Sequence, residues 1–483
     1  MNTSRSLDFP IWVPSALVKE LRQGLRTPAF IVLTSLIPTL LAFFFLFSFI
    51  VNPFDGEPFI SPDGCQVILW GTMIVTLLFI MPIRASTSTR EELLSRNNEL
   101  LLLTRQSAGR IVLGKWISFM AQSLLIMFIS LPFFLIRYYY GQIDLVQDMA
   151  LFALLYLGSG ILTAYTLWTS AMPSLLRIIA FFFLGMGVLT ITISPMDLIS
   201  FQEEMGESLF LAFIILVDAV LMTSSLLLLA REWFSPAAQN TAAPLRKLLL
   251  AFFILFIIPL PFLEHASSFI QKTMSVQIIF LMLYGAFLMI VNLTAPAHLL
   301  PIHVKQIKNK PLSGLQQFLF LPGLPGGVFF TLLLSILSVL ALYLIDRMTG
   351  TFKFHSFPFL FCLTVGIWYA LVMPAILLKP LWKKLKNNTL LAYALIWLVL
   401  SLLLNVLHSI HLALPIIPGG YLYELINEKS LPPFSEFSLL SLINLVAGMV
   451  ALFLSSQYWF AVRRNASASS PPPEPEAGLQ GRK

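Results

Sequence analysis

Charged side chains are scarce in this chain. Only 11% of its 483 residues are Asp, Glu, Lys or Arg, whereas 58% are hydrophobic. Soluble domains average about 25% charged and about 45–50% apolar residues. The shortage of charge therefore excludes a soluble enzyme, a disordered protein and a coiled coil. A transmembrane β-barrel is excluded as well, because its strands alternate apolar and polar residues.

Acidic residues are outnumbered by basic ones, and cysteine is almost missing. The chain has 23 Asp and Glu against 30 Lys and Arg, a formal net charge of +7. In a membrane protein such an excess is typical of cytoplasmic loops, so we expect no nucleic-acid partner. The two cysteines, Cys65 and Cys362, cannot form a disulfide framework and are interpreted as small apolar residues.

Long apolar runs are what the sequence has in abundance. A helix needs about 20 apolar residues to cross the hydrocarbon core of a bilayer. Twelve runs qualify, at residues 29–51, 66–83, 113–136, 150–169, 176–194, 208–230, 248–263, 275–296, 326–345, 357–378, 389–410 and 437–462. The sequence therefore predicts an all-α polytopic membrane protein with about 12 transmembrane helices.

The distribution of Lys and Arg sets the expected orientation. If the N-terminus is cytoplasmic, 25 of the 30 basic residues fall in cytoplasmic segments and 5 in the opposite loops. This bias predicts that both termini are cytoplasmic. The first long apolar run starts near Ala29, too late and too long for a cleavable signal peptide.

The loops leave little room for other domains. No segment between the expected spans exceeds about 30 residues, and a folded domain usually needs about 50. We therefore expect a chain without a catalytic domain of its own. Its predicted parts are a cytoplasmic N-terminus with an interfacial helix (1–28), two six-span halves (29–235 and 236–462) and a disordered cytoplasmic tail rich in Pro, Ser and Glu (463–483).

Residues 12–26 have the pattern of an amphipathic helix. Apolar and polar side chains separate onto two faces, with Leu17, Val18, Leu21 and Leu25 on one and Lys19, Glu20, Arg22, Gln23 and Arg26 mostly on the other. Such a helix lies in the plane of the membrane interface. The alternative is a short solvated helix whose charge is ordinary positive-inside charge.

The cytoplasmic loop at 84–115 contains an apolar block that is too short to span. Residues 99–103 read Glu-Leu-Leu-Leu-Leu, and they could form a short helix for a groove on a partner. The alternative, equally weighted, is that the leucines pack against the bundle. Residues 99–109 align without gaps to residues 317–327, in the equivalent loop of the second half. This match predicts an ancient duplication with both halves in the same orientation.

Residues 109–116 almost spell the phosphate-binding loop G-x-x-x-x-G-K-[ST]. The last position is Trp116, which has no hydroxyl for Mg²⁺, and a membrane span follows directly instead of a strand–loop–helix context. We therefore expect Arg110 and Lys115 to be interfacial anchors.

Within the expected spans, Asp218 is the one clear ionisable residue. A carboxylate there either contacts a substrate or an ion, or bonds to hydroxyls of a neighbouring helix. The second reading is favoured because no basic residue lies at similar depth. His408 and His411 share a helical face but have no obvious third ligand, so we expect no metal site.

Several short motifs combine into a family pattern. The loop gives Arg90-Glu91, Glu99 through Leu103, Thr104, Ser107, Ile111 and Gly114-Lys115, and the chain opens with Val18-Lys19-Glu20-Leu21-Arg22. In these features residues 1–235 resemble the ABC-2-type transporter permeases, whose pattern is roughly R-E…S-G-T-L-E-L-L-L-x-T-P-L-S…I-x-x-G-K. Arg96 and Arg105 depart from it, at the family's Gly and Pro. Residues 245–462 resemble the family only in architecture. In the loop of this second half, Ser313-Gly314 matches the S-G of the pattern, but Gln317 replaces its Glu.

The resemblance implies the membrane subunit of an ATP-driven transporter in a bacterial cytoplasmic membrane. Such a chain is not an enzyme and has no cofactor of its own, because ATP is bound by a separate ABC ATPase subunit. The implied functional residues are ATPase-coupling residues in two loops (Glu99, Leu100, Leu101, Leu103, Thr104 and Ser107; Leu319, Leu321 and Pro322), the lipid-contacting interfacial helix (Lys19, Glu20 and Arg22), and Asp218 on a substrate path. The substrate, the direction of transport, and the choice between a homodimer and a single-chain 12-span pore stay open.

Two other functions were weighed. An ion-coupled secondary transporter would need no partner, but such proteins usually carry several intramembrane ionisable groups. A membrane-embedded transferase would need a convergent His, Asp and Glu cluster at an interface. The sequence offers neither, so the ATP-driven transporter is the leading hypothesis.

Overall fold

A computed structural model gives the fold of the protein. It describes residues 15–48, 62–94, 107–138, 145–172, 205–235, 242–257 and 324–349, together with the single residues 284, 288, 289 and 396. All regular structure in these residues is helical, with no strand among them, which confirms the predicted all-α class for this part of the chain. The chain divides into two compact units, Met1–Pro236 and Ala237–Lys483.

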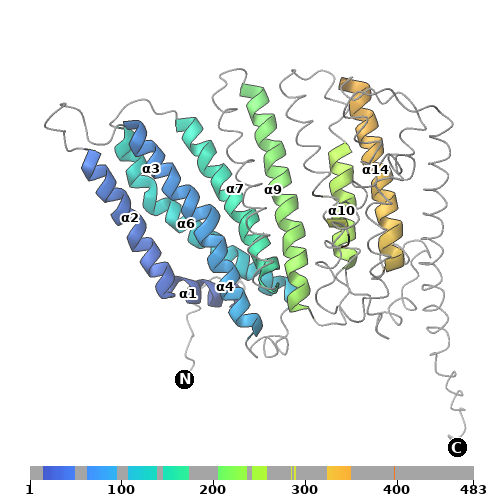
Figure 1. Cartoon of the computed structure of the whole chain (residues 1–483), viewed down its shortest axis with the longest axis horizontal. Helices are drawn as coiled ribbons and strands as arrows, with labels where there is room; N and C mark the ends of the chain where they lie inside the picture. The colour runs from blue at the N-terminus through green and yellow to red at the C-terminus, as the bar shows by residue number, and fades with distance from the viewer. Residues whose placement is uncertain are drawn as a thin grey trace, which may run out of the picture. The chain divides into compact units, whose positions relative to one another are not determined.

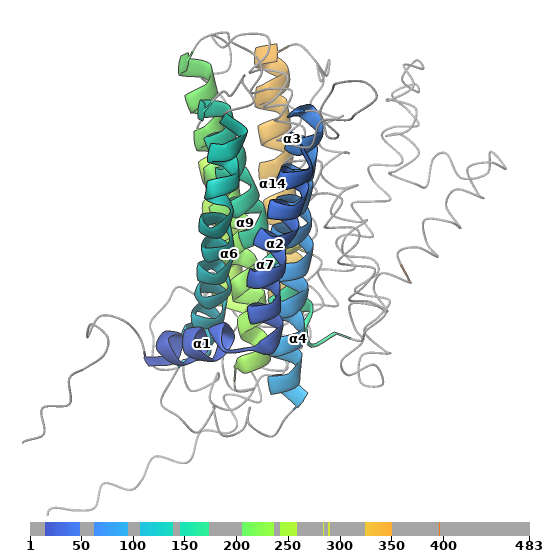
Figure 2. The same ribbon diagram turned by 90° about the vertical axis from the view of Figure 1, so that its left-hand side faces the viewer.

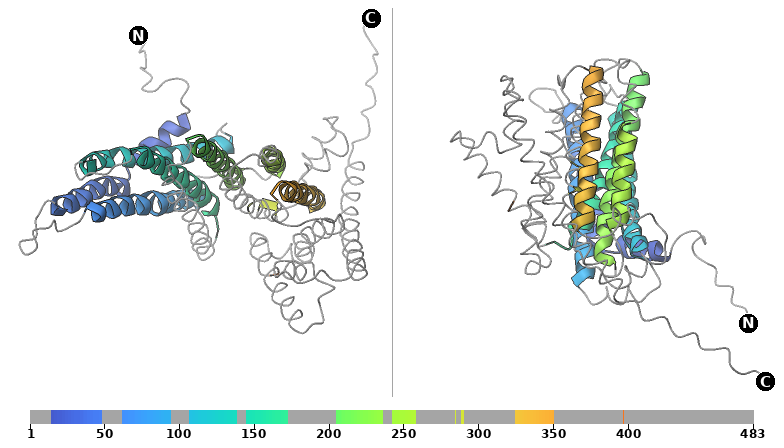
Figure 3. Two further views of the ribbon diagram at one scale, coloured as in Figure 1. Left: turned by 90° about the horizontal axis from the view of Figure 1, so that it is seen from above. Right: turned by 90° about the vertical axis from the view of Figure 1, so that its right-hand side faces the viewer.

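The first unit is a bundle of upright helices with one short helix lying across its base (Figure 1, Figure 2). Its helices in chain order are α1 (Ser15–Leu25), α2 (Pro28–Ser48), α3 (Pro62–Ile74), the π-helix η1 (Val75–Ile80), α4 (Met81–Leu94), α6 (Ala108–Tyr138), α7 (Leu145–Thr169) and α9 (Met205–Phe234). Helix α1 lies at the edge of the bundle, against α6 (Figure 3).

In the part of the chain that the structure describes, four helical stretches are long and apolar enough to cross a membrane. They are Pro28–Phe47, Gly64–Leu93, Ala108–Ile136 and Asp148–Thr169. Each coincides with one of the first four expected spans, so the chain has the helices of a membrane-embedded protein. Helix α9 covers the expected sixth span. The expected spans at 176–194, 357–378 and 437–462 lie outside the described residues, as do nearly all of those at 275–296 and 389–410.

The second span is longer than predicted. Apolar residues end near Ile83, yet the helix continues to Leu94, so the first part of the expected loop at 84–115 is helical. Two of its polar side chains, Ser86 and Thr89, are buried inside the bundle, and the Thr89 hydroxyl donates to the Ala85 carbonyl at 2.8 Å, whereas Thr87 and Glu91 are exposed. Hydropathy could not reveal this extension, because it does not distinguish a polar side chain packed between helices from one in water.

A π-helical turn interrupts this span at its middle. The amide of Met81 donates to the carbonyl of Thr76, five residues earlier. Pro82 follows at once and has no amide hydrogen to donate, and a proline ring clashes with the carbonyl four residues before it. The wider turn therefore lies where the proline disturbs the ordinary hydrogen-bond ladder.

Helix α7 is the centre of the first unit and α2 its periphery. In the apolar stretch of α7, 72% of the residues are buried, against 28% in α2. The exposed side chains of α2 are large and apolar, among them Ile31, Val32, Leu36, Phe43 and Leu46. Large apolar side chains on the outside of a bundle face the hydrocarbon of a bilayer, as the membrane assignment requires.

Helices α6 and α7 pack through small residues and hydrogen bonds. The indole of Trp116 donates to the Gly160 carbonyl at 3.0 Å, and the hydroxyls of Ser123 and Ser159 lie 3.4 Å apart. A Cβ atom on Gly160 would lie 3.3 Å from the Met120 methyl group. Lipid tails are as apolar as leucine, so close backbone approach and interhelical hydrogen bonds hold such a pair together.

The second unit contributes two described helices, α10 (Ala242–Ile257) and α14 (Leu324–Thr349), which pack against each other. They overlap the expected spans 248–263 and 326–345. Arg246 of α10 is buried, with its guanidinium 5.8 Å from the ring centroid of Phe330. The predicted duplication of the two halves stays a prediction.

Gly24 allows α1 to lie directly on α6. A Cβ atom built on Gly24 would come closer to the side-chain nitrogen of Gln122 than real Cβ atoms do, and 3.5 Å from the Ser118 hydroxyl. Gln122 is fully buried and donates to Ser118 at 3.4 Å. A side chain at position 24 must therefore displace the Gln122 amide.

We predict that Gly24→Ala destabilises the protein by about 1 kcal/mol or more, because the new methyl group displaces the buried Gln122 amide. In a Gln122→Ala background the same substitution should stabilise by up to about 1 kcal/mol, since only the higher helix propensity of Ala remains. Thermal unfolding of the four proteins in detergent measures this coupling. Equal effects of Gly24→Ala in both backgrounds would contradict the packing.

Candidate functional site

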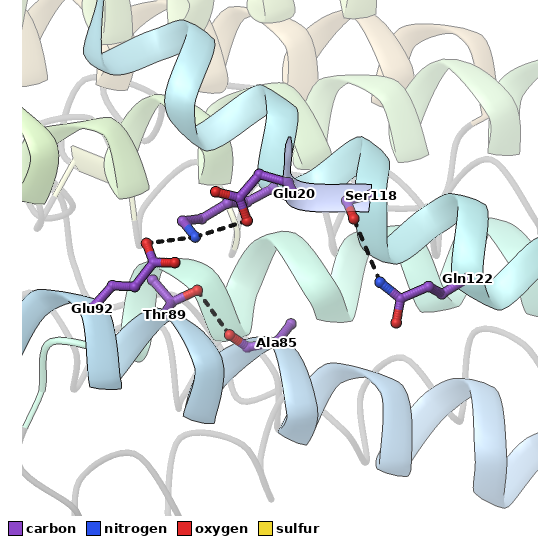
Figure 4. A network of polar contacts seen from close by, with 7 residues as sticks. Glu20, Ala85, Thr89, Glu92, Ser118 and Gln122 are labelled. Atoms are coloured by element: carbon purple, nitrogen blue, oxygen red, sulfur yellow. Dashed lines mark hydrogen bonds and ion pairs between the residues drawn. The ribbon is translucent and has the colours of Figure 1, made fainter. Parts of the chain in front are cut away.

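Three helices distant in sequence meet at one buried ammonium group. Lys115 of α6 is 1% exposed, and its Nζ lies 2.7 Å from a carboxylate oxygen of Glu92 on α4 and 3.1 Å from one of Glu20 on α1. Figure 4 shows the two carboxylates converging on it. We call this group, with Gly24, Thr27 and Arg84, the α1 junction.

The local sequence places each member of the ion pairs at a helix end or face. Lys115 lies two turns into α6, which begins at Ala108 after the Ser107 carbonyl accepts the first amide hydrogen bonds, from Arg110 and Ile111. Glu92 lies in the last turn of α4. Glu20 and Gly24 are four residues apart, so they share the face of α1 that packs on α6.

The surroundings of Lys115 correct one sequence-based expectation. It does not extend toward water as an interfacial anchor would, because its ammonium group is buried between two carboxylates. The side chains of Glu20 and Glu92 are themselves only 16% and 21% exposed. A buried charge is tolerated only when paired and hydrogen-bonded, so Lys115 is a structural cation. Arg110, by contrast, is exposed.

A second contact joins α4 to the turn between α1 and α2. Arg84 donates from Nη2 to the Thr27 hydroxyl at 2.9 Å, and its guanidinium lies 5.1 Å from the ring centroid of Phe30. The Thr27 hydroxyl donates in turn to the Gly24 carbonyl at 2.7 Å, and Pro28 begins α2. Proline is favoured at a first helical position and disfavours helix in the residue before it. The chain therefore turns sharply here, and Arg84 fixes the turn.

Lys19, Glu20 and Arg22, the predicted functional residues of the interfacial helix, lie on different faces of α1. Glu20 faces α6 and Lys115. Lys19 and Arg22 are exposed, and with Arg26 they line an open hollow of about 740 Å³ at the turn into α2. The helix thus has a cationic face and a bundle-facing face, where the sequence predicted one mixed polar face.

Most predicted ATPase-coupling residues lie outside the described part of the chain. These are Glu99, Leu100, Leu101, Leu103 and Thr104 in the first loop, and Leu319, Leu321 and Pro322 in the second. Ser107 is described; it is exposed and precedes α6 directly. Asp218 lies in α9, half-buried, and has an interaction within the protein.

Four members of the α1 junction were not predicted from the sequence, namely Gly24, Thr27, Arg84 and Glu92. Only Glu92 could have been suspected from the sequence, because it directly follows the Arg90-Glu91 motif. One lysine and two glutamates near the ends of apolar runs could have suggested a pairing, but sequence spacing alone does not identify partners that are 23 and 95 residues from Lys115.

The α1 junction connects three helices. Glu92 lies in the last turn of α4 and Lys115 near the start of α6, and the ammonium group of Lys115 joins these two helices to each other and to α1.

We predict strong non-additivity among the substitutions of the ion pairs. Glu20→Gln or Glu92→Gln alone should cost about 1 kcal/mol or less, because the other carboxylate still neutralises Lys115. The double variant should lose about 3–5 kcal/mol, the cost of leaving a buried charge without its partner. Lys115→Met should be similarly destabilising, and exposed Lys19→Met is the control with little effect.

Thermal unfolding of the purified full-length variants measures these differences. Small, additive losses in the two Gln variants and their combination would show that the junction does not depend on a buried cation.

No family model matches this chain, and neither a curated protein nor a solved structure matches it. Its function has therefore to be inferred from the membrane helices, the α1 junction and the motif of residues 90–115.

Proposed function

We propose that the chain is the membrane subunit of an ATP-driven transporter of the ABC-2 type. A separate ATPase subunit docks on the cytoplasmic loops of the two halves, at 84–112 and 297–325, and binds the ATP. The chain itself forms the path for a substrate across a bacterial cytoplasmic membrane.

The observation that supports this proposal most is the meeting of three motif segments. Residues 18–22, 90–91 and 114–115 are far apart in sequence, and they carry the resemblance together with the leucine block. In the structure Glu20 and Lys115, from two of these segments, form one buried cluster with Glu92, the residue that directly follows the third. A chance match in leucine-rich sequence gives no reason for these segments to be neighbours.

The geometry also suggests how the partner would act. The leucine block lies between the end of α4 and the start of α6, and both helix ends are fixed to α1 through Lys115. Force applied by an ATPase at residues 99–107 would move α4, α6 and α1 as a unit. Such motion of the helix ends would switch the bundle between inward-open and outward-open states.

We predict that Leu101→Glu combined with Leu103→Glu abolishes association with the ATPase while membrane insertion is unchanged. Two leucines that we propose to enter a groove of the partner would be replaced by charges, and burying a charge there carries a large desolvation cost. The measurement is co-purification of an ATPase, identified by its sequence, and of ATP hydrolysis with the tagged chain in mild detergent.

The matched control is Asn97→Glu with Asn98→Glu, which adds the same charge to the same loop and keeps every leucine. It should retain most of the associated ATPase. Undiminished co-purification by the Leu101 and Leu103 double variant would refute docking at this block, and the absence of any ATPase from the wild-type chain would refute the proposed function.

Substitutions of Asp218 distinguish a structural role of its carboxyl group from a role on the substrate path. If its carboxyl group serves structure, Asp218→Asn should fold normally and keep turnover, because Asn has the same size and can make similar hydrogen bonds. Asp218→Leu, which removes both charge and hydrogen bonding, should lower the thermal midpoint. A well-folded Asn variant that binds its ATPase but has lost turnover would instead assign this residue to the substrate path.

A further inference from the structure

The middle of the second span has an interrupted hydrogen-bond ladder. In η1 the Met81 amide donates to the carbonyl of Thr76, five residues earlier, whereas an α-helix bonds residues four apart. Pro82 has no amide hydrogen to donate to the carbonyl of Leu78, four residues before it. Both interruptions fall in the same part of the span, so this part lacks some of the bonds that keep a helix straight.

Two threonines weaken the ladder further at and before this turn. The Thr72 hydroxyl donates to the Ile68 carbonyl and the Thr76 hydroxyl to the Thr72 carbonyl, both at 2.7 Å. A hydroxyl that shares the carbonyl of the preceding turn slightly destabilises and bends a helix. A Cβ atom built on Gly71 would meet no atom of the described chain within 4 Å, so this glycine is not needed for packing and lowers the helix propensity. Residues 68–82 therefore resist bending less than a regular helix does.

On one side of this turn, directional contacts hold α4. A carboxylate oxygen of Glu92 lies 2.7 Å from the ammonium group of Lys115 on α6, and Arg84 donates to the Thr27 hydroxyl at 2.9 Å. Ion pairs and hydrogen bonds of this kind weaken steeply when their distances and angles change. Helix α4 is therefore held in one position relative to α1 and α6, beside which it lies in Figure 2.

On the other side of the turn, α3 has aromatic and sulfur contacts. The ring centroid of Trp70 lies 5.1 Å from that of Phe134 on α6 and 5.2 Å from that of Phe152 on α7. The Ser130 hydroxyl lies 3.5 Å from the Met73 sulfur, which is a weak acceptor. Apolar attraction has no fixed direction, and a methionine side chain adapts to a changed neighbour. A change in the angle of α3 therefore costs less than a change in the angle of α4.

We propose that η1 is a hinge, about which α3 swings while α4 stays with α1 and α6. Sharp helix kinks, of more than about 20°, occur almost always at prolines, π-helical turns or similar interruptions. A swing of about 20° would move the far end of α3 by about 7 Å, because its 13 residues span about 20 Å. The hinge itself needs no partner. Its use in transport, as the joint where motion of α4 opens or closes the α3 end of the bundle, rests on the proposed function.

The test measures distances between spin labels by double electron–electron resonance, in the full-length protein in mild detergent with its two native cysteines replaced. The α3 pair, Val67→Cys on α3 and Met149→Cys on α7, reports the position of α3. The α4 pair, Thr87→Cys on α4 and Leu113→Cys on α6, reports the position of α4. All four side chains are exposed, so the labels should leave the packing intact. The distances of the α3 pair should spread over about 7 Å more than those of the α4 pair. Equal widths would show a static kink and overturn the hinge.

Two variants remove the interruptions of the ladder. A π-helical turn contains one residue more than an α-helical turn, so deletion of Val75 together with Pro82→Ala gives the span a regular ladder. Val75 is 51% exposed, and its loss leaves no gap in the core. The excess width of the α3 pair should then disappear. Thr72→Val with Thr76→Val keeps the chain length and the side-chain shape, and it should remove part of the excess because both hydroxyls are lost.

The matched control is Thr34→Val with Thr39→Val in α2, where the hydroxyls likewise donate to carbonyls of their own helix. It should leave the distances of both pairs unchanged, and a narrowing there would overturn the assignment of the hinge to η1. An unchanged width in the variants of the second span would do the same. If the deletion prevents folding, the variant of Thr72 and Thr76 decides alone.

The hinge and the proposed function fail separately. A chain that has no ATPase partner but shows the broad α3 distances would refute the transporter and leave the hinge intact. A chain that co-purifies with an ATPase but shows equal widths would refute the hinge alone. In the complex, deletion of Val75 with Pro82→Ala should keep the ATPase and lose most of the turnover, and full turnover in that variant would refute the use of the hinge in transport.

Discussion

A buried ammonium group can stay charged only if other groups replace the water it has lost, and Lys115 imposes this condition on three helices. Two carboxylates satisfy this condition, one from α1 and one from the last turn of α4. Removing either partner alone leaves a neutral pair, whereas removing both leaves an isolated charge whose burial costs several kcal/mol. The position of α1 on the bundle and the alignment of the ends of α4 and α6 follow from this one electrostatic requirement.

Close packing makes the pairing possible. The carboxylate of Glu20 reaches Lys115 because α1 lies directly on α6, and Gly24 favours this approach because a Cβ atom there would displace the side chain of Gln122. Deeper in the bundle, Gly160 and the paired hydroxyls of Ser123 and Ser159 allow α6 and α7 a similar approach. In a membrane, where apolar contact with lipid competes with apolar contact between helices, small residues and hydrogen bonds determine which surfaces meet.

Helix α1 combines three surfaces in 11 residues. One contacts α6, one carries Lys19 and Arg22, and one is apolar with Leu17 and Leu21. One face of this helix is fixed to the bundle, and the charged face is exposed. If an ATPase moves the neighbouring helix ends, as we propose, α1 would move with them.

The sequence by itself determined the class of the protein and the place of its first membrane helices, because an uninterrupted apolar run of about 20 residues has few stable conformations other than a spanning helix. It also located the amphipathic helix before Pro28. It could not give the extension of the second span to Leu94 or the burial of Lys115, since the hydropathy of a residue does not reveal whether polar partners surround it. Only the tertiary structure decided those, because Glu20, Glu92 and Lys115 become neighbours through the packing of three helices and not through any local pattern.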